Sequence, residues 1–260
     1  MSVPRFYLPE MPANGLVELS SADSLHASNV LRLGAGQHVQ LFDGVGGRAE
    51  GVIRQVAKKC VQVEYEQRVE FPEQQSPNLH LGVSLPKGDR QKVLIDGLTQ
   101  LGVATLTPIL SRRSVAQPAE KSLQRLQRSV IEACKQCGRD RLMQINEPQR
   151  IEDVVGGSLA ADSESEGLTT LKFFAHPYGN TVSVAALLRD SGFAAASESK
   201  DSVASHAAVC LIGPEGGWTD KECQTLEERG FRRVSLGGNI LRIEMAALSI
   251  ASVVLNSHVA

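Results

Sequence analysis

Two glycine-rich turns, each placed between an apolar run and a helical pattern, constrain the fold of this chain more than any other feature. The first, residues 213–217 (Gly-Pro-Glu-Gly-Gly), follows the apolar run 207–212. The second, residues 237–239 (Gly-Gly-Asn), precedes the apolar run 245–255. Strand, turn and helix in this order are typical of open α/β sheets, where ligands bind beyond the carboxyl ends of the strands. We therefore expect the two turns to form two walls of one pocket.

The first turn carries its own helix signal. Thr219 and Glu222 have the spacing of a capping box, and Gly230 stands where a helix ends by the usual C-terminal preference. The turn is not a phosphate-binding Walker loop, because no Lys-Ser/Thr pair follows the glycines, and it is not Gly-x-Gly-x-x-Gly. A plain strand-to-helix connection is the alternative to a ligand-binding turn.

The second turn leads to two charges at the mouth of an apolar helix. Arg242 and Glu244 precede the run 245–255, which is apolar or small on all sides and is therefore expected to be buried. The run is too short to span a bilayer. Because burying an unpaired charge is costly, we expect the two residues to pair, to face a ligand, or both.

The N-terminal part of the chain reads as a small β-domain, predicted over residues 1–72. Residues 39–42 and 48–54 flank a glycine-rich hairpin signal at 43–47, and residues 59–65 alternate as a further strand. Short strands with glycine turns predict a small barrel. Two prolines and several amides at 70–78 mark the linker.

The second domain is predicted over residues 78–260, with an α/β architecture. A strand at 79–85, a helix at 90–101 and a strand at 103–110 give a βαβ pattern, which predicts a mostly parallel sheet. A long helix follows at 118–137, and strands are expected at 169–174 and 207–212 around a helix at 182–188. The small and acidic stretches at 156–167 and 191–205 are expected to be surface loops.

The distribution of charge predicts a nucleic-acid surface. Formal net charge is only −2, yet residues 80–150 hold twelve Lys/Arg against six Asp/Glu. A solvated helix face is the competing interpretation. Arginines of the first domain and of the basic segment are candidates for phosphate contact. The predicted RNA-binding residues are Arg5, Arg32, Arg112, Arg113, Arg125, Arg128 and Arg139.

Cysteine usage and hydropathy indicate a cytoplasmic protein without a membrane anchor. Five cysteines without framework spacing predict reduced thiols. Cys134 and Cys137 lack the second pair that a zinc site needs, so we interpret them as helical core positions and expect no metal. No signal peptide is expected at the N-terminus, and no apolar run reaches the length of a transmembrane helix.

Several motifs together make the chain resemble the RsmE family of ribosomal RNA methyltransferases. They are Pro4-Arg-Phe-Tyr7, Leu41-Phe-Asp-Gly44, Ala133-Cys-Lys-Gln-Cys-Gly-Arg139, His176-Pro177, Leu211-Ile-Gly-Pro-Glu-Gly-Gly217 and Leu236-Gly-x-x-Ile-Leu-Arg-x-Glu244. The resemblance implies a PUA-like barrel that grips RNA, followed by a SPOUT-type α/β domain with a C-terminal trefoil knot. It also implies a homodimer, the small ribosomal subunit as partner, and methylation of N3 of one uridine in its rRNA from S-adenosylmethionine.

The same resemblance implies roles for individual residues. Arg242 would stabilise the uracil anion, and Glu244 would act as base or hold Arg242. Asn239 and Met245 depart from the Arg and Thr of the family, and Gly97 and Gln100 from its Lys and Glu. Alternatives are a SPOUT methyltransferase for another RNA, such as tRNA, and a non-catalytic RNA-binding homologue. The predicted cofactor-binding residues are His176, Pro177, Leu211, Ile212, Gly213, Pro214, Gly216, Gly217, Leu236, Gly237, Ile240, Leu241 and Arg242.

Overall fold

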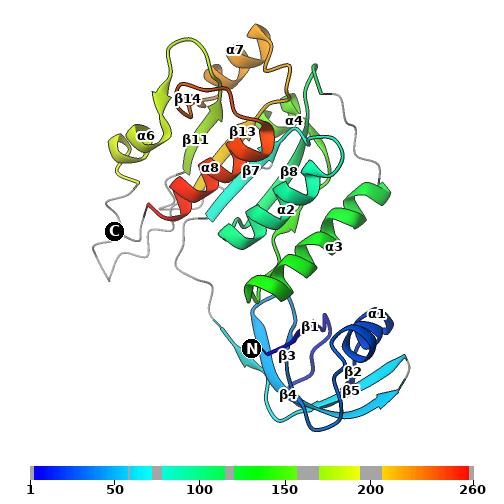
Figure 1. Cartoon of the computed structure of the whole chain (residues 1–260). Coiled ribbons are helices and arrows are strands. Elements are labelled where there is room, and N and C mark those ends of the chain that lie inside the picture. Colours follow the sequence, from blue (N-terminus) through cyan, green and yellow to red (C-terminus); the bar gives the residue numbers. More distant parts are fainter. Residues whose placement is uncertain are drawn as a thin grey trace. The chain divides into compact units, whose positions relative to one another are not determined.

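The computed structural model describes residues 3–57, 59–71, 78–114, 120–156, 170–193 and 207–257. Its contacts divide the chain into two compact units (Figure 1). One unit consists of Met1–Gln74 together with Ile131–Leu142, and the other of Gln75–Val130 together with Met143–Ala260. Residues 72–77 of the linker predicted at 70–78 lie outside the described residues, as do residues 157–167 and 194–205 of the loops predicted at 156–167 and 191–205.

The first unit is built on a six-stranded sheet with the order β1-β3-β4-β5-β2, in which β6 also pairs with β4. The antiparallel pair β3–β4 surrounds the predicted hairpin turn at 43–47. Alternate side chains of each strand face one core, as the period of a β-strand requires; in β5 these are Val61, Val63 and Tyr65. The strands are β1 (Arg5–Tyr7), β2 (Gly15–Glu18), β3 (His38–Phe42), β4 (Gly47–Ala57), β5 (Cys60–Tyr65) and β6 (Val69–Glu70).

A helical segment interrupts the strands of this unit. It consists of α1 (Ser21–Leu25), continued by a π-helical turn, η1 (His26–Val30). Ser20 caps α1 by accepting a hydrogen bond from the Asp23 backbone at 3.1 Å. Arg32, which follows, has φ 53°, the one non-glycine residue with positive φ in the described chain.

The second unit contains an eight-stranded sheet with the order β10-β8-β7-β13-β11-β14-β12, in which β9 also pairs with β8. Every pair in this sheet is parallel, which confirms the predicted parallel α/β class. The strands are β7 (Asn78–Val83), β8 (Thr105–Leu110), β9 (Gln144–Ile145), β10 (Gln149–Arg150), β11 (Thr170–Ala175), β12 (Val182–Ser183), β13 (Ala207–Ile212) and β14 (Arg232–Ser235).

Both faces of this sheet are covered, which is the usual state of a parallel sheet. Along β13, Val209 and Leu211 belong to a cluster that also contains side chains of α4 and α7, whereas Ala208 and Cys210 are buried outside that cluster. In Figure 1, α2 and α8 lie over one face and α4 and α7 over the other. The helices are α2 (Arg90–Leu101), α3 (Glu120–Cys137), α4 (Ile151–Gly156), α6 (Val184–Asp190), α7 (Asp220–Glu228) and α8 (Ile243–Leu255).

Local signals explain where several helices begin and end. Gly102 terminates α2 with φ 94°, and Gly230 follows α7 with φ 81°, a backbone conformation in which a Cβ is unfavourable. The predicted capping box of Thr219 and Glu222 is present at the start of α7. No helix within the described ranges is both long enough and apolar enough to cross a bilayer.

The last helix is less completely buried than its composition predicts. Residues such as Ala247, Ile250 and Val254 are buried, but Met245 is 49% and Val253 is 40% exposed. One stripe of α8 is therefore not covered by the described part of the chain.

Candidate active site

Three loops meet at one edge of the parallel sheet. In the register of the sheet, Ala175 at the end of β11 pairs with Ile212 at the end of β13 and with Val234 of β14. The loops that follow these three neighbouring strands therefore leave from the same edge. His176, the first residue after β11, donates its backbone N–H to the Val234 oxygen at 2.9 Å. This is the edge at which open α/β sheets bind ligands.

The sequence-predicted cofactor residues all fall on these loops or on the strand ends that lead into them. Leu211 and Ile212 are the buried last residues of β13, and His176-Pro177 follow β11. Gly213, Pro214, Gly216 and Gly217 form the turn after β13, and Leu236, Gly237, Ile240, Leu241 and Arg242 form the turn between β14 and α8.

The first turn requires two of its glycines for different reasons. Gly217 closes the turn with φ 69° and donates its N–H to the Pro214 oxygen at 2.8 Å. Positive φ of this kind favours glycine. Gly213 has ordinary backbone geometry, but a Cβ there would lie 2.8 Å from Cε2 of Trp218. The turn therefore owes part of its shape to an indole ring packed directly against the backbone.

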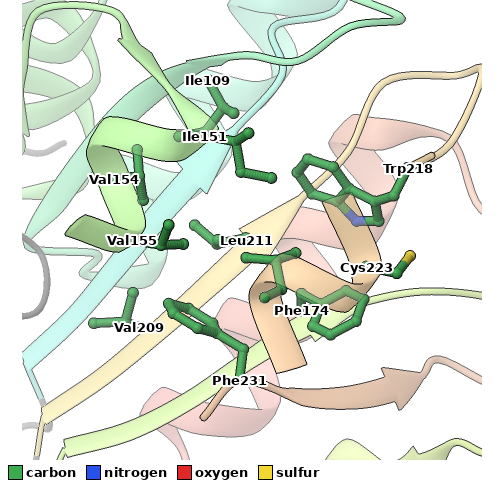
Figure 2. Packing of buried hydrophobic residues seen from close by; sticks show 11 residues of the cluster. Ile109, Ile151, Val154, Val155, Phe174, Val209, Leu211, Trp218, Cys223 and Phe231 are labelled. Atoms are coloured by element: carbon green, nitrogen blue, oxygen red, sulfur yellow. The ribbon is translucent and has the colours of Figure 1, made fainter. Parts of the chain in front are cut away.

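Trp218 is a functional-site residue that sequence reasoning missed. It is 4% exposed, and its Nε1 donates a hydrogen bond to the Ala175 oxygen at 3.1 Å. Figure 2 shows its ring beside Phe174 and Cys223, within the cluster between the sheet and helices α4 and α7. The available signal was the position of the chain's only tryptophan directly after the glycine turn.

The start of α7 is fixed to a neighbouring loop through Glu222. This carboxylate is 3% exposed and accepts hydrogen bonds from the Thr219 backbone at 2.7 Å and the Thr219 hydroxyl at 2.8 Å. Its other oxygen accepts a bond from the Arg112 backbone N–H at 3.0 Å. A buried carboxylate with this many donors is a structural anchor.

The second turn presents open backbone. Gly237 has φ 104°, and residues 237–240 are exposed. Among the described residues, the main-chain groups of 237–241 take part in no backbone hydrogen bond. Ile240 is 70% exposed in spite of its apolar side chain.

The two charges after this turn do not form the expected pair. Arg242 is the N-cap of α8 and is exposed, and within the described chain it forms no ion pair. Glu244 is 6% exposed, and its Oε2 has no hydrogen-bond partner among the described residues. Of the two expectations for these residues, pairing is therefore not met within the described chain, and facing a ligand remains. An unpartnered buried carboxylate oxygen requires a functional explanation.

The predicted RNA-binding arginines differ in the exposure of their side chains and in the hydrogen bonds that these side chains form. Arg32, Arg112 and Arg128 are exposed, Arg139 is half-buried, and Arg125 is exposed but bonds to Gln91 Oε1 at 3.1 Å. Arg113 is also exposed, and it donates from Nη1 to the Gly216 oxygen at 2.8 Å. Arg5, Arg32 and Arg139 belong to the first unit, and Arg112, Arg113, Arg125 and Arg128 belong to the second.

Arg5, which was predicted to bind RNA, is instead engaged with other residues of the first unit. Its side chain is 9% exposed, and its Nη2 lies 2.6 Å from Asp140 Oδ1. It also donates to the oxygens of Gly138 and Arg139 and lies 4.9 Å from the centre of the Phe42 ring. A guanidinium with these partners is committed to holding residues 138–140 and has little surface left for a phosphate.

The cysteine prediction is half right. Cys134 is buried, and burial raises the pKa of its thiol to about 12, so it stays protonated at neutral pH. Cys137, the last residue of α3, is exposed instead of belonging to the buried stripe. Glu132, expected to pair with Arg128, pairs with Lys135 at 2.9 Å.

Comparisons with known proteins agree with this geometry. Residues 73–255 match the family model described as RNA methyltransferase domain, and residues 19–65 match the RNA methyltransferase PUA domain. The ribosomal RNA small subunit methyltransferase E of a Synechocystis species is 31% identical, over 90% of this chain and 71% of that protein. The protein of the same name from Rickettsia conorii is 28% identical over 99% and 98%.

Two solved structures are similar along nearly the whole chain. A methyltransferase from Legionella pneumophila, in complex with S-adenosylmethionine, has a TM-score of 0.81 and 28% identity, covering 98% of this chain and 97% of that one. A ribosomal RNA small subunit methyltransferase E from Neisseria gonorrhoeae, bound to S-adenosylmethionine, has a TM-score of 0.77 and 28% identity, covering 96% of each chain. The predicted combination of a PUA-like domain and an α/β methyltransferase domain with a parallel sheet is confirmed. The chain belongs to the ribosomal RNA small subunit methyltransferase E family.

Proposed function

We propose that this chain transfers a methyl group from S-adenosylmethionine to N3 of a uridine in small-subunit rRNA. The observation that carries the proposal is the meeting of three loops, after β11, β13 and β14, at one sheet edge. The Legionella and Neisseria relatives that share this fold bind S-adenosylmethionine, and curated relatives bear the name of a small-subunit rRNA methyltransferase. Such a substrate places the chain in the cytoplasm, where small subunits are assembled.

The loops offer groups that fit the cofactor. A nucleoside with an amino-acid tail needs hydrogen bonds from main-chain groups and apolar surfaces for its rings. The open backbone of 237–241 supplies the first, and the half-buried side chain of Leu241 supplies the second. The space beside Gly237 is open, because a Cβ there would meet no atom within 4 Å. The thirteen predicted cofactor residues remain our proposal for this site.

The residues of this chain are proposed to remove the proton on N3 of the uridine and to stabilise the resulting anion. Bound S-adenosylmethionine supplies an electrophilic methyl group on sulfur. The uridine must lose its N3 proton to expose the lone pair that attacks, and a carboxylate is a suitable acceptor. Glu244 has a buried carboxylate oxygen without a hydrogen-bond partner among the described residues, and we assign it as the base. We assign Arg242, which forms no ion pair in the described chain, to stabilise the uracil anion.

We further propose that the chain acts as a homodimer through the uncovered stripe of α8. Met245 and Val253 on α8, Val93 on α2 and Ile240 before α8 are between 40% and 70% exposed. Apolar surface of this kind is typical of the core of a protein interface. The measurement is the mass in solution by light scattering. Wild-type protein should be a dimer, and Met245→Glu with Val253→Glu should be a monomer; a wild-type monomer contradicts this part of the proposal.

Arginines outside the cofactor loops are proposed to contact rRNA phosphates. Exposed Arg32, Arg112 and Arg128 have the required accessibility, and we retain Arg125 and Arg139 as candidates. Phosphate contacts of this type make affinity depend on salt. Replacing Arg125 and Arg128 by Glu should lower RNA affinity and reduce the salt dependence while cofactor affinity stays constant. Unchanged RNA affinity would mean that this helix face is only solvated.

The experiment that tests the proposed function is methyl transfer in vitro. Purified protein, labelled S-adenosylmethionine and small ribosomal subunits lacking the modification should yield labelled rRNA. Calorimetry on the same protein separates the alternatives. A folded protein that binds no cofactor is an RNA-binding homologue without catalysis, and one that labels tRNA instead of rRNA is a methyltransferase for another RNA.

A further inference from the structure

We infer that Arg113 is a positioning residue that holds the Gly-rich cofactor turn in its binding shape. This rests on the proposed function, because the turn after β13 must be the one that holds S-adenosylmethionine. The sequence pattern assigned Arg113, together with Arg112, to RNA phosphates. The contacts of the two neighbouring arginines separate their roles.

The first step is geometric. Nη1 of Arg113 donates to the Gly216 oxygen at 2.8 Å and to the Trp218 oxygen at 3.4 Å. The aliphatic part of the side chain lies along the same turn, since a Cβ on Gly216 would come within 3.3 Å of Arg113 Cβ and 3.4 Å of its Cδ. One side chain therefore contacts the turn both through its charge and through its stem.

The second step concerns what holds Arg113 itself. It follows β8 in a tight turn, closed by the Ser114 N–H to the Ser111 oxygen at 3.1 Å and by the Ser111 N–H to Ser114 Oγ at 2.9 Å. The Arg112 backbone ties this turn to Glu222 of α7. Arg113 thus extends from a turn that is itself held by hydrogen bonds, so its guanidinium can restrain the glycine-rich turn after β13.

The third step is the consequence for binding. Glycine-rich turns lose much conformational freedom when they are ordered. A turn that is already ordered in the free protein binds its ligand more tightly, because binding then loses no conformational entropy of the turn. Glu215 of the same turn also pairs with Arg90 at 3.2 Å, but both side chains are at least one-third exposed, so this pair contributes little. Within the described chain, Arg113 is the residue outside the β13–α7 connection whose side chain donates hydrogen bonds to the main-chain oxygens of this connection.

The test compares Arg113→Met with Arg112→Met in the full-length protein. Each variant loses one positive charge and keeps an unbranched stem, but only Arg113 uses its side chain on the cofactor turn. S-adenosylmethionine affinity is measured by calorimetry, KM and kcat with small-subunit rRNA, and folding by thermal melting. Arg113→Met should weaken cofactor binding about tenfold, the scale of one hydrogen bond to a charged group. Its KM for the cofactor should rise while kcat at saturation and the melting temperature stay near wild type.

A control variant and a rescue variant distinguish a positioning role of Arg113 from an RNA contact. Arg112→Met should bind the cofactor as wild type does. Arg113→Lys should recover most of the affinity, because a single nitrogen makes both bonds. Equal cofactor affinity in the two Met variants, or weakened RNA binding alone in Arg113→Met, overturns the inference and makes Arg113 an RNA contact. Wild-type protein that binds no cofactor overturns the proposed function itself, together with this inference.

Discussion

Trp218 Nε1 donates a hydrogen bond to the main-chain oxygen of Ala175 at 3.1 Å, and so joins the loop after β13 to the last residue of β11. The ring that makes this bond also packs on Gly213, where no Cβ fits. Two strand ends that are remote in sequence are therefore fixed to each other at the edge where the proposed cofactor binds.

Replacing Trp218 by Phe should weaken both the fold and the cofactor site. The change keeps an aromatic ring but leaves the part-buried Ala175 oxygen without this donor, which costs about 1 kcal/mol. Urea unfolding measures this loss, and calorimetry should show severalfold weaker S-adenosylmethionine binding. Tyr65→Phe is the matched control, because it removes a hydrogen bond to the Pro12 oxygen in the first unit. If both variants bind the cofactor equally well, the Trp218 bond does not shape the site.

Gly97 of α2 packs closely against α8. A Cβ at this position of α2 would lie 2.4 Å from Cδ2 of Leu248 in α8. Gly97→Ala requires the half-buried Leu248 side chain to shift, so the gain of about 1 kcal/mol in helix propensity should be offset in the wild-type background. In a Leu248→Ala background the same change should be stabilising, since the obstructing methyl is gone. Additive effects in this double-mutant cycle, measured by chemical unfolding, would refute the contact.

His80 gives the stability of the second unit a pH dependence. Burial lowers the pKa of its imidazole to about 4, from an ordinary value of about 6.5. Its Nε2 lies 2.7 Å from Thr107 Oγ1, which also accepts a bond from Asn146 Nδ2 at 3.0 Å. Thr107 Oγ1 thus has polar partners on two sides, and burial keeps the His80 ring neutral in the folded state.

The sign of the effect follows from proton binding. Between pH 6.5 and about 4 the unfolded chain binds a proton at His80 that the folded chain does not. Stability is thus complete above about pH 6.5 and falls by about 3 kcal/mol as the pH drops to about 4. His80→Gln should remove most of this dependence in urea unfolding, whereas His26→Gln, at an exposed position, should keep it. A wild-type profile that is flat between pH 4 and 6.5 would contradict the assignment.

Sequence patterns were sufficient for the elements whose determinants are local. The bounds predicted for α2 and β13 agree with the structure, and the capping box of Thr219 and Glu222 is present, because periodicity, caps and glycine stops act within a few residues. The shared sheet edge of the three loops followed from the parallel order that alternating strands and helices imply.

Local sequence patterns do not predict contacts between residues that are far apart in the sequence. No local pattern shows that Ile131–Leu142 belongs to the first unit, or that Arg5 is buried against Asp140. The short strands β9 and β10 and helix α4 were also missed, because elements of two to six residues carry too little periodicity. The trefoil knot, the homodimer and the roles of the site residues came from family resemblance and remain predictions.

Arg242 is predicted to affect catalysis far more than stability. It is exposed at the N-cap of α8 without a side-chain capping bond. Arg242→Lys keeps the charge but loses the planar fork of donors, and methylation should fall about a hundredfold, the scale of losing one preorganised donor. Melting temperature and cofactor affinity should barely change. Arg229→Lys, at the exposed end of α7, is the control, and a large drop in melting temperature for Arg242→Lys with normal residual activity would make Arg242 a structural anchor.

The most direct test of the central claim is a map of methylated uridines in small-subunit rRNA from a strain that lacks this chain. Wild-type chain returned on a plasmid should restore N3 methylation at a single uridine, and Glu244→Gln should leave that position unmodified although the protein is folded and binds S-adenosylmethionine. An rRNA map that is identical with and without the chain would contradict the account.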